Sequence, residues 1–140
     1  MSKFIPYGKH YLDKNDREAV NKVLKSSSIT QGPTIEKFEK KIANYVGSKY
    51  AIAVSSCTAG MHLALLASRI NKKSKVLTSP ITFVSTANVV EFCNSNLDFV
   101  DIDENSLNLS LDILKKNFID KKKKFDAIIP VHFGGNTFNT

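Results

Sequence analysis

The sequence predicts an α/β fold with a mostly parallel sheet flanked by helices. Short apolar segments alternate four times with segments in which apolar residues recur at helical spacing. No Asn-Gly or similar hairpin turn lies between the apolar segments. Because parallel strands need crossover helices, this alternation favours βαβ units over an antiparallel sheet.

The first third of the chain is expected to be helical and to precede the sheet. Residues 3–9 are predicted to form an extended arm, and Asp13 to cap a first helix. A polar linker over residues 26–31 ends this N-terminal part (residues 1–32). Pro33 is tolerated in the first turn of a second helix, and Gly47 is expected to end that helix.

A turn of small residues connects the first predicted strand with the next helix. Residues 51–54 are apolar and read as a buried parallel strand, and residues 59–70 carry apolar side chains at helical spacing. Between them lies Ser55-Ser56-Cys57-Thr58. The start of a helix offers unpaired N–H groups and favours an anion such as phosphate. Thr58 is placed either to cap this helix or to bind a phosphate oxygen.

The remaining chain repeats the same unit. Strands are expected at residues 76–78, 97–100 and 127–131, with a helix over residues 84–93 and another that Ser110 caps. Ligands of parallel sheets bind beyond the carboxyl ends of the strands. Three polar or aromatic clusters lie at such ends, namely residues 55–58, 79–83 and 132–135.

Composition argues against nucleic acid and membrane partners. The chain has 140 residues and a net charge of +7, but lysine runs at 72–75 and 121–124 supply much of the positive charge. Basic surfaces that bind nucleic acid usually mix arginine and aromatic residues into such runs. No apolar run reaches the ~20 residues that cross a bilayer, so a cytoplasmic protein is expected.

Neither the cysteines nor the histidines form a metal-binding pattern. Cys57 and Cys93 lack metal-ligand spacing and are expected to be small buried residues, so no metal is predicted. His62 is expected to be packed or partly exposed. His132 follows the last strand and either faces a ligand or forms an ordinary loop contact. No helix follows that strand, so a longer protein is expected.

Six stretches together resemble the DegT/DnrJ/EryC1/StrS family of pyridoxal-phosphate-dependent nucleotide-sugar aminotransferases. They occur in the family's order between residues 5 and 135: I-P-Y-G, I-T-Q-G-P, Y-V-G-S-K-Y-A-I-A-V-S-S-C-T-A-G-M-H-L-A-L, T-S-P-I-T-F-V-S-T-A-N, F-V-D-I-D and P-V-H-F-G-G. The resemblance implies that residues 1–140 are the N-terminal part of the large domain of a fold-type I pyridoxal-phosphate-dependent transferase.

The resemblance also implies where the cofactor would bind. The turn that holds the phosphate of pyridoxal 5′-phosphate corresponds to Ser56, Cys57, Thr58 and Ala59. Phe83 corresponds to the aromatic residue that stacks on the cofactor ring. From the residues alone, an ordinary core phenylalanine is the favoured interpretation of Phe83.

The substrate positions implied by the resemblance lie mainly near the N-terminus. Tyr7, Ser27, Ser28, Ile29 and Thr30, together with Cys57, correspond to residues that line the sugar-nucleotide pocket; unaided, they read as an arm and a linker. The expected reaction moves an amino group from glutamate to a UDP-linked 4-keto-6-deoxy-N-acetylhexosamine, in a homodimer. The stretch T-S-P-I-T-F-V-S-T-A-N most resembles the branch that makes UDP-4-amino-4,6-dideoxy-N-acetyl-β-L-altrosamine for pseudaminic acid, a component of cell-surface polysaccharides.

No catalytic residue of the expected reaction can be assigned within the chain. The resemblance places the Schiff-base lysine and the acid that pairs with the pyridine nitrogen downstream of Thr140. We therefore expect residues 1–140 alone to be inactive and poorly stable. Alternatives are another keto-sugar aminotransferase, a sugar dehydratase of the same family that uses pyridoxamine phosphate, and a non-catalytic fragment.

Overall fold

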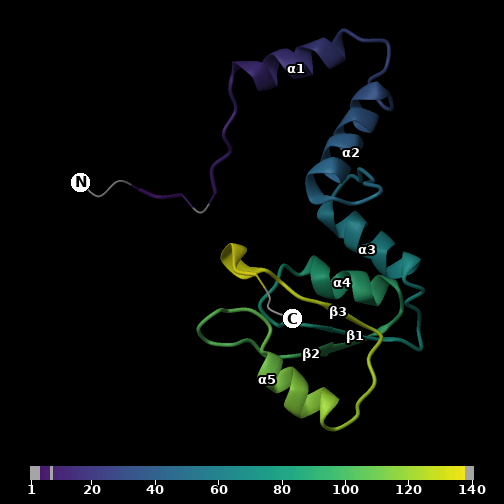
Figure 1. The fold of residues 1–140 in the computed structure, drawn as a ribbon, viewed down its shortest axis with the longest axis vertical. Coiled ribbons are helices and arrows are strands. Elements are labelled where there is room, and N and C mark those ends of the chain that lie inside the picture. Colours follow the sequence, from purple (N-terminus) through teal and green to yellow (C-terminus); the bar gives the residue numbers. More distant parts are fainter. Residues whose placement is uncertain (1–3, 7, 138–140) are drawn as a thin grey trace. The chain divides into compact units, whose positions relative to one another are not determined.

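The structure, a computed structural model, describes residues 4–6 and 8–137 (Figure 1). The chain divides into two compact units, with the boundary between Ala53 and Val54. Unit 1 contains two helices and unit 2 contains a sheet with helices on both faces. No helix in the described part of the chain has the length and apolar character needed to span a membrane.

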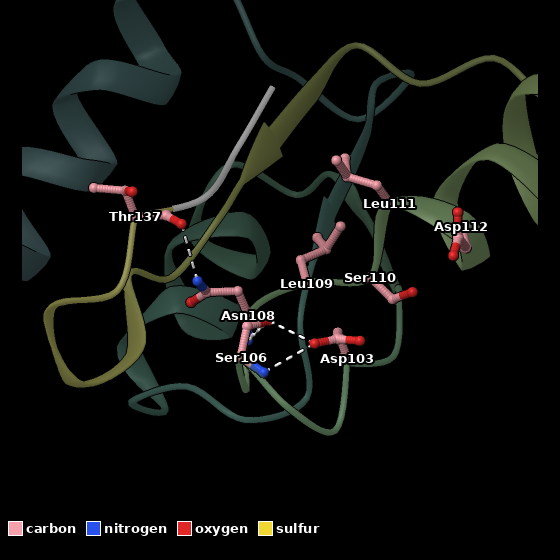
Figure 2. Close-up of a pocket in the computed structure, with 8 residues that line it drawn as sticks. All are labelled: Asp103, Ser106, Asn108, Leu109, Ser110, Leu111, Asp112 and Thr137. Carbon is pink, nitrogen blue, oxygen red and sulfur yellow. Dashed lines mark hydrogen bonds between the residues drawn. The ribbon is translucent and has the colours of Figure 1, made fainter.

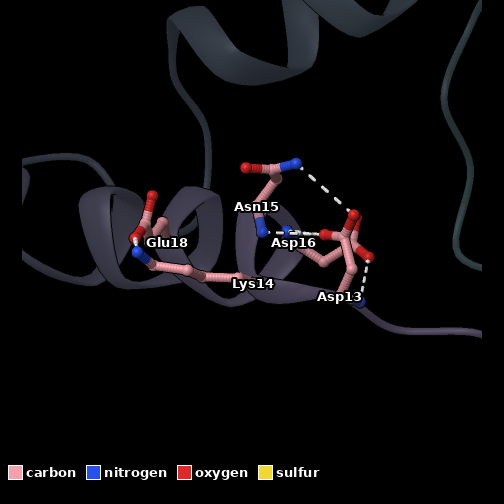
Figure 3. Close-up of polar contacts among 5 residues, drawn as sticks. All are labelled: Asp13, Lys14, Asn15, Asp16 and Glu18. Carbon is pink, nitrogen blue, oxygen red and sulfur yellow. Dashed lines mark hydrogen bonds and ion pairs between the residues drawn. The ribbon is translucent and has the colours of Figure 1, made fainter.

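Helix α1 of unit 1 covers Lys14–Leu24 and begins with a capping box (Figure 3). The Oδ1 atom of Asp13 accepts hydrogen bonds from the N–H groups of Asn15 (2.7 Å) and Asp16 (3.1 Å). Asp16 reciprocates, because its Oδ2 atom accepts from the Asp13 N–H at 2.9 Å. These bonds satisfy N–H groups that have no partner inside the helix, and they confirm the predicted cap.

Helix α2 covers Pro33–Val46, with both ends where the sequence predicts them. Gly32 precedes the helix at a close approach, because a Cβ atom there would lie 2.8 Å from the Cβ of Ser28. Gly47 ends the helix with φ of 70°, a left-handed conformation that costs glycine little. The local sequence therefore accounts for the limits of this helix.

Unit 2 contains a three-stranded parallel sheet in the order β2-β1-β3. Its elements, in chain order, are α3 (Cys57–Ala67), β1 (Lys75–Thr78), α4 (Ser85–Phe92), β2 (Asn96–Phe99), α5 (Leu111–Leu114), the π-helical turn η1 (Lys115–Ile119), β3 (Ala127–Ile129) and the 3-10 turn η2 (Phe133–Gly135). Ser110 caps α5 as predicted, since its Oγ atom accepts from the Ile113 N–H at 3.3 Å. The predicted α/β fold with a parallel sheet is confirmed.

Alternate residues of the central strand face two separate clusters of buried apolar side chains. Val76 faces the cluster that contains Leu65 of α3 and Val90 of α4. Leu77 faces the opposite cluster, which contains Leu114 of α5 and Phe118 of η1. Figure 1 shows α4 and α5 on opposite sides of the sheet. Both faces are therefore covered, as a parallel sheet requires.

The predicted strand at residues 51–54 is wrong. These residues belong to no helix or strand, and none of the described strands pairs with them. Ile52 is 80% exposed, and the Ala53 N–H donates to the Oε1 atom of Glu39 at 2.8 Å instead of to a neighbouring strand. A β-strand requires hydrogen bonds to a neighbouring strand, so the apolar character of residues 51–54 is not enough to make them one.

Candidate functional site

A cavity of about 390 Å³ opens in unit 2 beyond the carboxyl ends of β1 and β3. The first turns of α3 and α4, the loop after β1 and the residues at the end of β3 form its wall. The lining residues are Cys57, Thr58, Met61, Thr82, Phe83, Ser85, Thr86, Ile129, Pro130 and Val131. This position is where ligands of parallel sheets bind, and the volume lies in the usual range for small-molecule pockets.

Ser56, and not Thr58, caps α3. The Oγ atom of Ser56 accepts from the Ala59 N–H at 3.1 Å, and the Ser56 carbonyl accepts from the Gly60 N–H at 3.0 Å. The capping role considered for Thr58 is therefore wrong. The N–H groups of Cys57 and Thr58 come before the first intrahelical bond, so they remain available to an anion at this end of the helix.

Phe83 lies on the wall of the cavity and not in the core. Its side chain is 76% exposed and belongs to neither buried apolar cluster. The interpretation of Phe83 as a core phenylalanine is therefore wrong. An exposed aromatic ring at a cavity wall offers a flat apolar face to a ligand.

A hydrogen bond between distant parts of the sequence joins the two strands that end at the cavity. Thr78, the last residue of β1, is fully buried, and its hydroxyl donates to the Ile129 carbonyl at 2.8 Å. The same two residues are partners in the parallel register. The ends of β1 and β3 are thus held together where the cavity opens.

The lining contains hydroxyl groups but no charged side chain. Thr58, Thr82, Ser85 and Thr86 supply the hydroxyls. Thr82 belongs to the cluster at residues 79–83 that the sequence places at a strand end, but the sequence analysis did not single out Ser85, Thr86 or the end of β3. A bound anion here would rely on helix N–H groups and hydroxyls, without a lysine or arginine among the described lining residues.

The predicted substrate residues, apart from Cys57, lie elsewhere in the chain. Ser27, Ser28, Ile29 and Thr30 belong to unit 1, between α1 and α2. Ser27 and Ser28 line a cavity of about 360 Å³ in that unit, and Ile29 is 66% exposed. Tyr7 lies outside the described residues.

A second cavity of unit 2, of about 330 Å³, lies beside the loop that follows β2 (Figure 2). Asn108 is buried there, and its Oδ1 atom accepts from the Phe133 N–H at 2.9 Å while its Nδ2 atom donates to the carbonyls of Asn136 and Thr137, each at 3.2 Å. Hydrogen bonds from Ser106 and from the Asn105 N–H lower the pKa of Asp103 below its ordinary value. The bonds of Asn108 secure the segment that follows β3.

The cysteines and histidines follow the sequence predictions only in part. Both cysteines are free; Cys93 is buried as predicted, but Cys57 is exposed because it begins α3 at the cavity. His62 is partly exposed and packs edge-on against Phe92, with ring centroids 5.6 Å apart, as predicted. Across the described residues, no cluster of His, Cys, Asp and Glu could hold a metal ion.

Comparison with protein families gives a match over nearly the whole chain. The model of the DegT/DnrJ/EryC1/StrS aminotransferase family matches residues 10–140. One relative, the spore coat polysaccharide biosynthesis protein SpsC of Bacillus subtilis (strain 168), is 41% identical over 134 residues, which are 96% of this chain and 34% of SpsC. The chain thus spans about a third of the length of that relative.

Solved structures of sugar aminotransferases share this fold. The sugar aminotransferase CalS13 from Micromonospora echinospora is 30% identical, with a TM-score of 0.83 over 97% of this chain and 36% of CalS13. The PMP-form of the putative sugar aminotransferase Spr1654 from Streptococcus pneumoniae is 21% identical, with a TM-score of 0.86 over 97% of this chain and 33% of Spr1654. Because Spr1654 is only 21% identical, its similarity to this chain shows a shared fold and nothing more.

Proposed function

The chain belongs to the DegT/DnrJ/EryC1/StrS aminotransferase family, and on that premise we propose that the protein binds pyridoxal 5′-phosphate and transfers an amino group to a nucleotide-linked keto sugar. The observation that supports this best is the cavity in unit 2. It joins the first turn of α3, the exposed ring of Phe83 and the end of β3 in one site.

The proposed phosphate site is the start of α3. The N–H groups of Cys57 and Thr58 and the partial positive charge of the helix end attract an anion, and the Thr58 hydroxyl adds one donor. Ser56 contributes by capping the helix, since its Oγ atom already accepts from Ala59. In this assignment Ser56 and Ala59 shape the turn, whereas Cys57 and Thr58 contact the phosphate.

The proposed ring site is the face of Phe83. A flat aromatic side chain suits a pyridine ring, and such pairs contribute on the order of 1 kcal/mol beyond the burial of area. Bound pyridoxal phosphate would supply an electron sink for the substrate carbon. The exposed lysines at 121–124 are poor candidates for covalent attachment, because they lie in the loop before β3 and none of them lines the cavity.

The substrate class that we propose is a UDP-linked 4-keto-6-deoxy-N-acetylhexosamine, with glutamate as amino donor, in a cytoplasmic homodimer. The relation to a spore coat polysaccharide biosynthesis protein supports a role in cell-surface sugars. The stretch T-S-P-I-T-F-V-S-T-A-N favours the pseudaminic acid branch. Tyr7, residues 27–30 and Cys57 are the proposed sugar-nucleotide contacts.

The cofactor assignment is tested by titrating the full-length protein with pyridoxal phosphate and following the absorbance of the bound form. Thr58→Val and Phe83→Leu should each weaken binding about 3- to 10-fold, the effect of losing roughly 1 kcal/mol. Thr34→Val is the matched control, because Thr34 is the second residue of α2 as Thr58 is of α3. Unchanged affinity in both variants would contradict the assignment.

The reaction is tested by supplying glutamate and a UDP-4-keto sugar and analysing the product by mass spectrometry. An amino sugar containing the nitrogen of 15N-labelled glutamate is the expected product. A dehydrated sugar without that nitrogen would favour the dehydratase alternative. Cofactor binding without either product would favour a different substrate class.

A further inference from the structure

Phe83 lies in the loop between β1 and α4, and its ring does not pack against either buried apolar cluster. Phe83 is 76% exposed, and the following residue, Val84, is 62% exposed. Packing therefore does little to hold the ring in one place. The position of the ring depends on the backbone of residues 82 and 83, which hydrogen bonds must fix.

One residue, Thr86, bonds to this loop twice, once to its backbone and once to a side chain. Its N–H donates to the Phe83 carbonyl at 2.9 Å, which begins the first turn of α4. Its hydroxyl oxygen accepts from the Thr82 hydroxyl at 2.8 Å. Phe83 is thus bracketed by a bond to its own carbonyl and a bond to the preceding side chain.

The environment of Thr86 suits such a role. Thr86 is 5% exposed and lines the cavity, so its side chain is held by packing. Val84, the N-cap residue of α4, makes no side-chain cap. Among the hydrogen bonds described for this turn, the Thr82–Thr86 bond is therefore the one in which side chains join the loop to α4.

We propose that Thr86 is a positioning residue, which acts through Thr82 to hold Phe83 against the ring of the bound cofactor. This inference rests on the proposed function, because it presumes that a flat ring binds at Phe83. It assigns Thr86 no direct contact with the cofactor. The hydroxyl, and not the bulk of the side chain, is the part that matters.

The test compares Thr86→Val, which removes the hydroxyl at nearly constant volume, with Thr86→Ser, which keeps it. In the full-length protein, Thr86→Val should weaken pyridoxal phosphate binding about 3- to 10-fold and reduce the circular dichroism of the bound cofactor. Thr86→Ser, which keeps the hydroxyl, should retain both the affinity for pyridoxal phosphate and the circular dichroism of the bound cofactor. Thr34→Val, at the same position of α2, should change neither.

A double-mutant cycle with Phe83→Leu separates positioning from a general structural role. If Thr86 acts through Phe83, Thr86→Val should add little to the loss that Phe83→Leu already causes. Equal losses in both backgrounds would overturn the inference. Thr82→Val removes the same contact from the loop side, and it carries the test if Thr86→Val does not fold.

The outcomes distinguish this inference from the proposed function. Absence of cofactor binding by the unsubstituted protein would overturn both. Normal binding and an unchanged dichroism signal in Thr86→Val and Thr82→Val, with weakened binding in Phe83→Leu, would overturn the positioning role and leave the cofactor assignment in place.

Discussion

Unit 1 and unit 2 both contain apolar side chains at helical spacing, but unit 2 buries many more of them among the described residues. In unit 2, Val76, Leu77, Val89, Val90 and Val100 have no exposed surface. In unit 1, helix α1 has no buried residue and helix α2 has one, Ala43, while Phe38 of α2 is 56% exposed. The sheet of unit 2 supplies a surface on which helices can pack, whereas the described residues of unit 1 form no strand.

This difference separates two sources of stability. The helices of unit 1 rely on local features such as the Asp13 capping box and the left-handed Gly47. Unit 2 relies on contacts between residues that are far apart in the chain, such as Thr78 with Ile129. Substitutions should therefore have large effects in the core of unit 2 and small effects on the apolar face of α2.

The largest expected effect is that of Leu77→Ala in the full-length protein. Leu77 is fully buried in the central strand, so its truncation should lower the free energy of unfolding by about 2–5 kcal/mol. Phe38→Ala, on the exposed face of α2, should change it by less than about 0.5 kcal/mol. Urea unfolding followed by circular dichroism gives both values. Similar losses in the two variants would show that the α2 face is buried in solution.

Asn108→Ala should have the next largest effect. Asn108 is buried and bonds three backbone groups of the segment after β3, so its loss should cost about 1–3 kcal/mol. Hydrogen exchange at the Phe133 amide should become faster, because that N–H loses its acceptor. Asn105→Ala is the control, since the Asn105 side chain is exposed. Equal exchange rates would mean that other contacts hold the segment.

Asp13→Ala tests the local source of stability in unit 1. Loss of an N-cap side chain costs about 1 kcal/mol, and the effect should be confined to α1. Glu18→Ala removes only the exposed 3.5 Å ion pair with Lys14 and should cost less. Amide exchange along α1 measures both. A loss of structure in unit 2 on Asp13→Ala would contradict the local origin of this stability.

The smallest expected effect is the pH dependence of the turn at Asp103. Because folding lowers the pKa of this carboxyl, its stabilising contribution is fully present above the ordinary value of 3.8 and disappears as the pH falls through the lowered folded value. Asp103→Asn should flatten the acid dependence of amide exchange at Ser106, whose N–H donates to Asp103 at 2.8 Å. An identical acid profile in the variant would assign the dependence to another group.

The sequence alone predicted the features that depend on neighbouring residues. The cap at Asp13, the end of α2 at Gly47 and the cap at Ser110 each involve contacts within a few positions, so the residue types suffice to predict them. The family resemblance correctly indicated an aminotransferase relative and an α/β fold with a parallel sheet.

The tertiary structure decided the features that depend on distant partners. Residues 51–54 have the composition of a strand, but no described strand pairs with them. Phe83 is an apolar residue of the kind that fills cores, but it lies at a cavity. The cavity itself exists because the parallel register brings Thr78 beside Ile129, and with them the starts of α3 and α4 beside the end of β3. Register and burial arise from the packing of segments about 50 residues apart, and a local sequence pattern carries no information about which distant segment will pack against it.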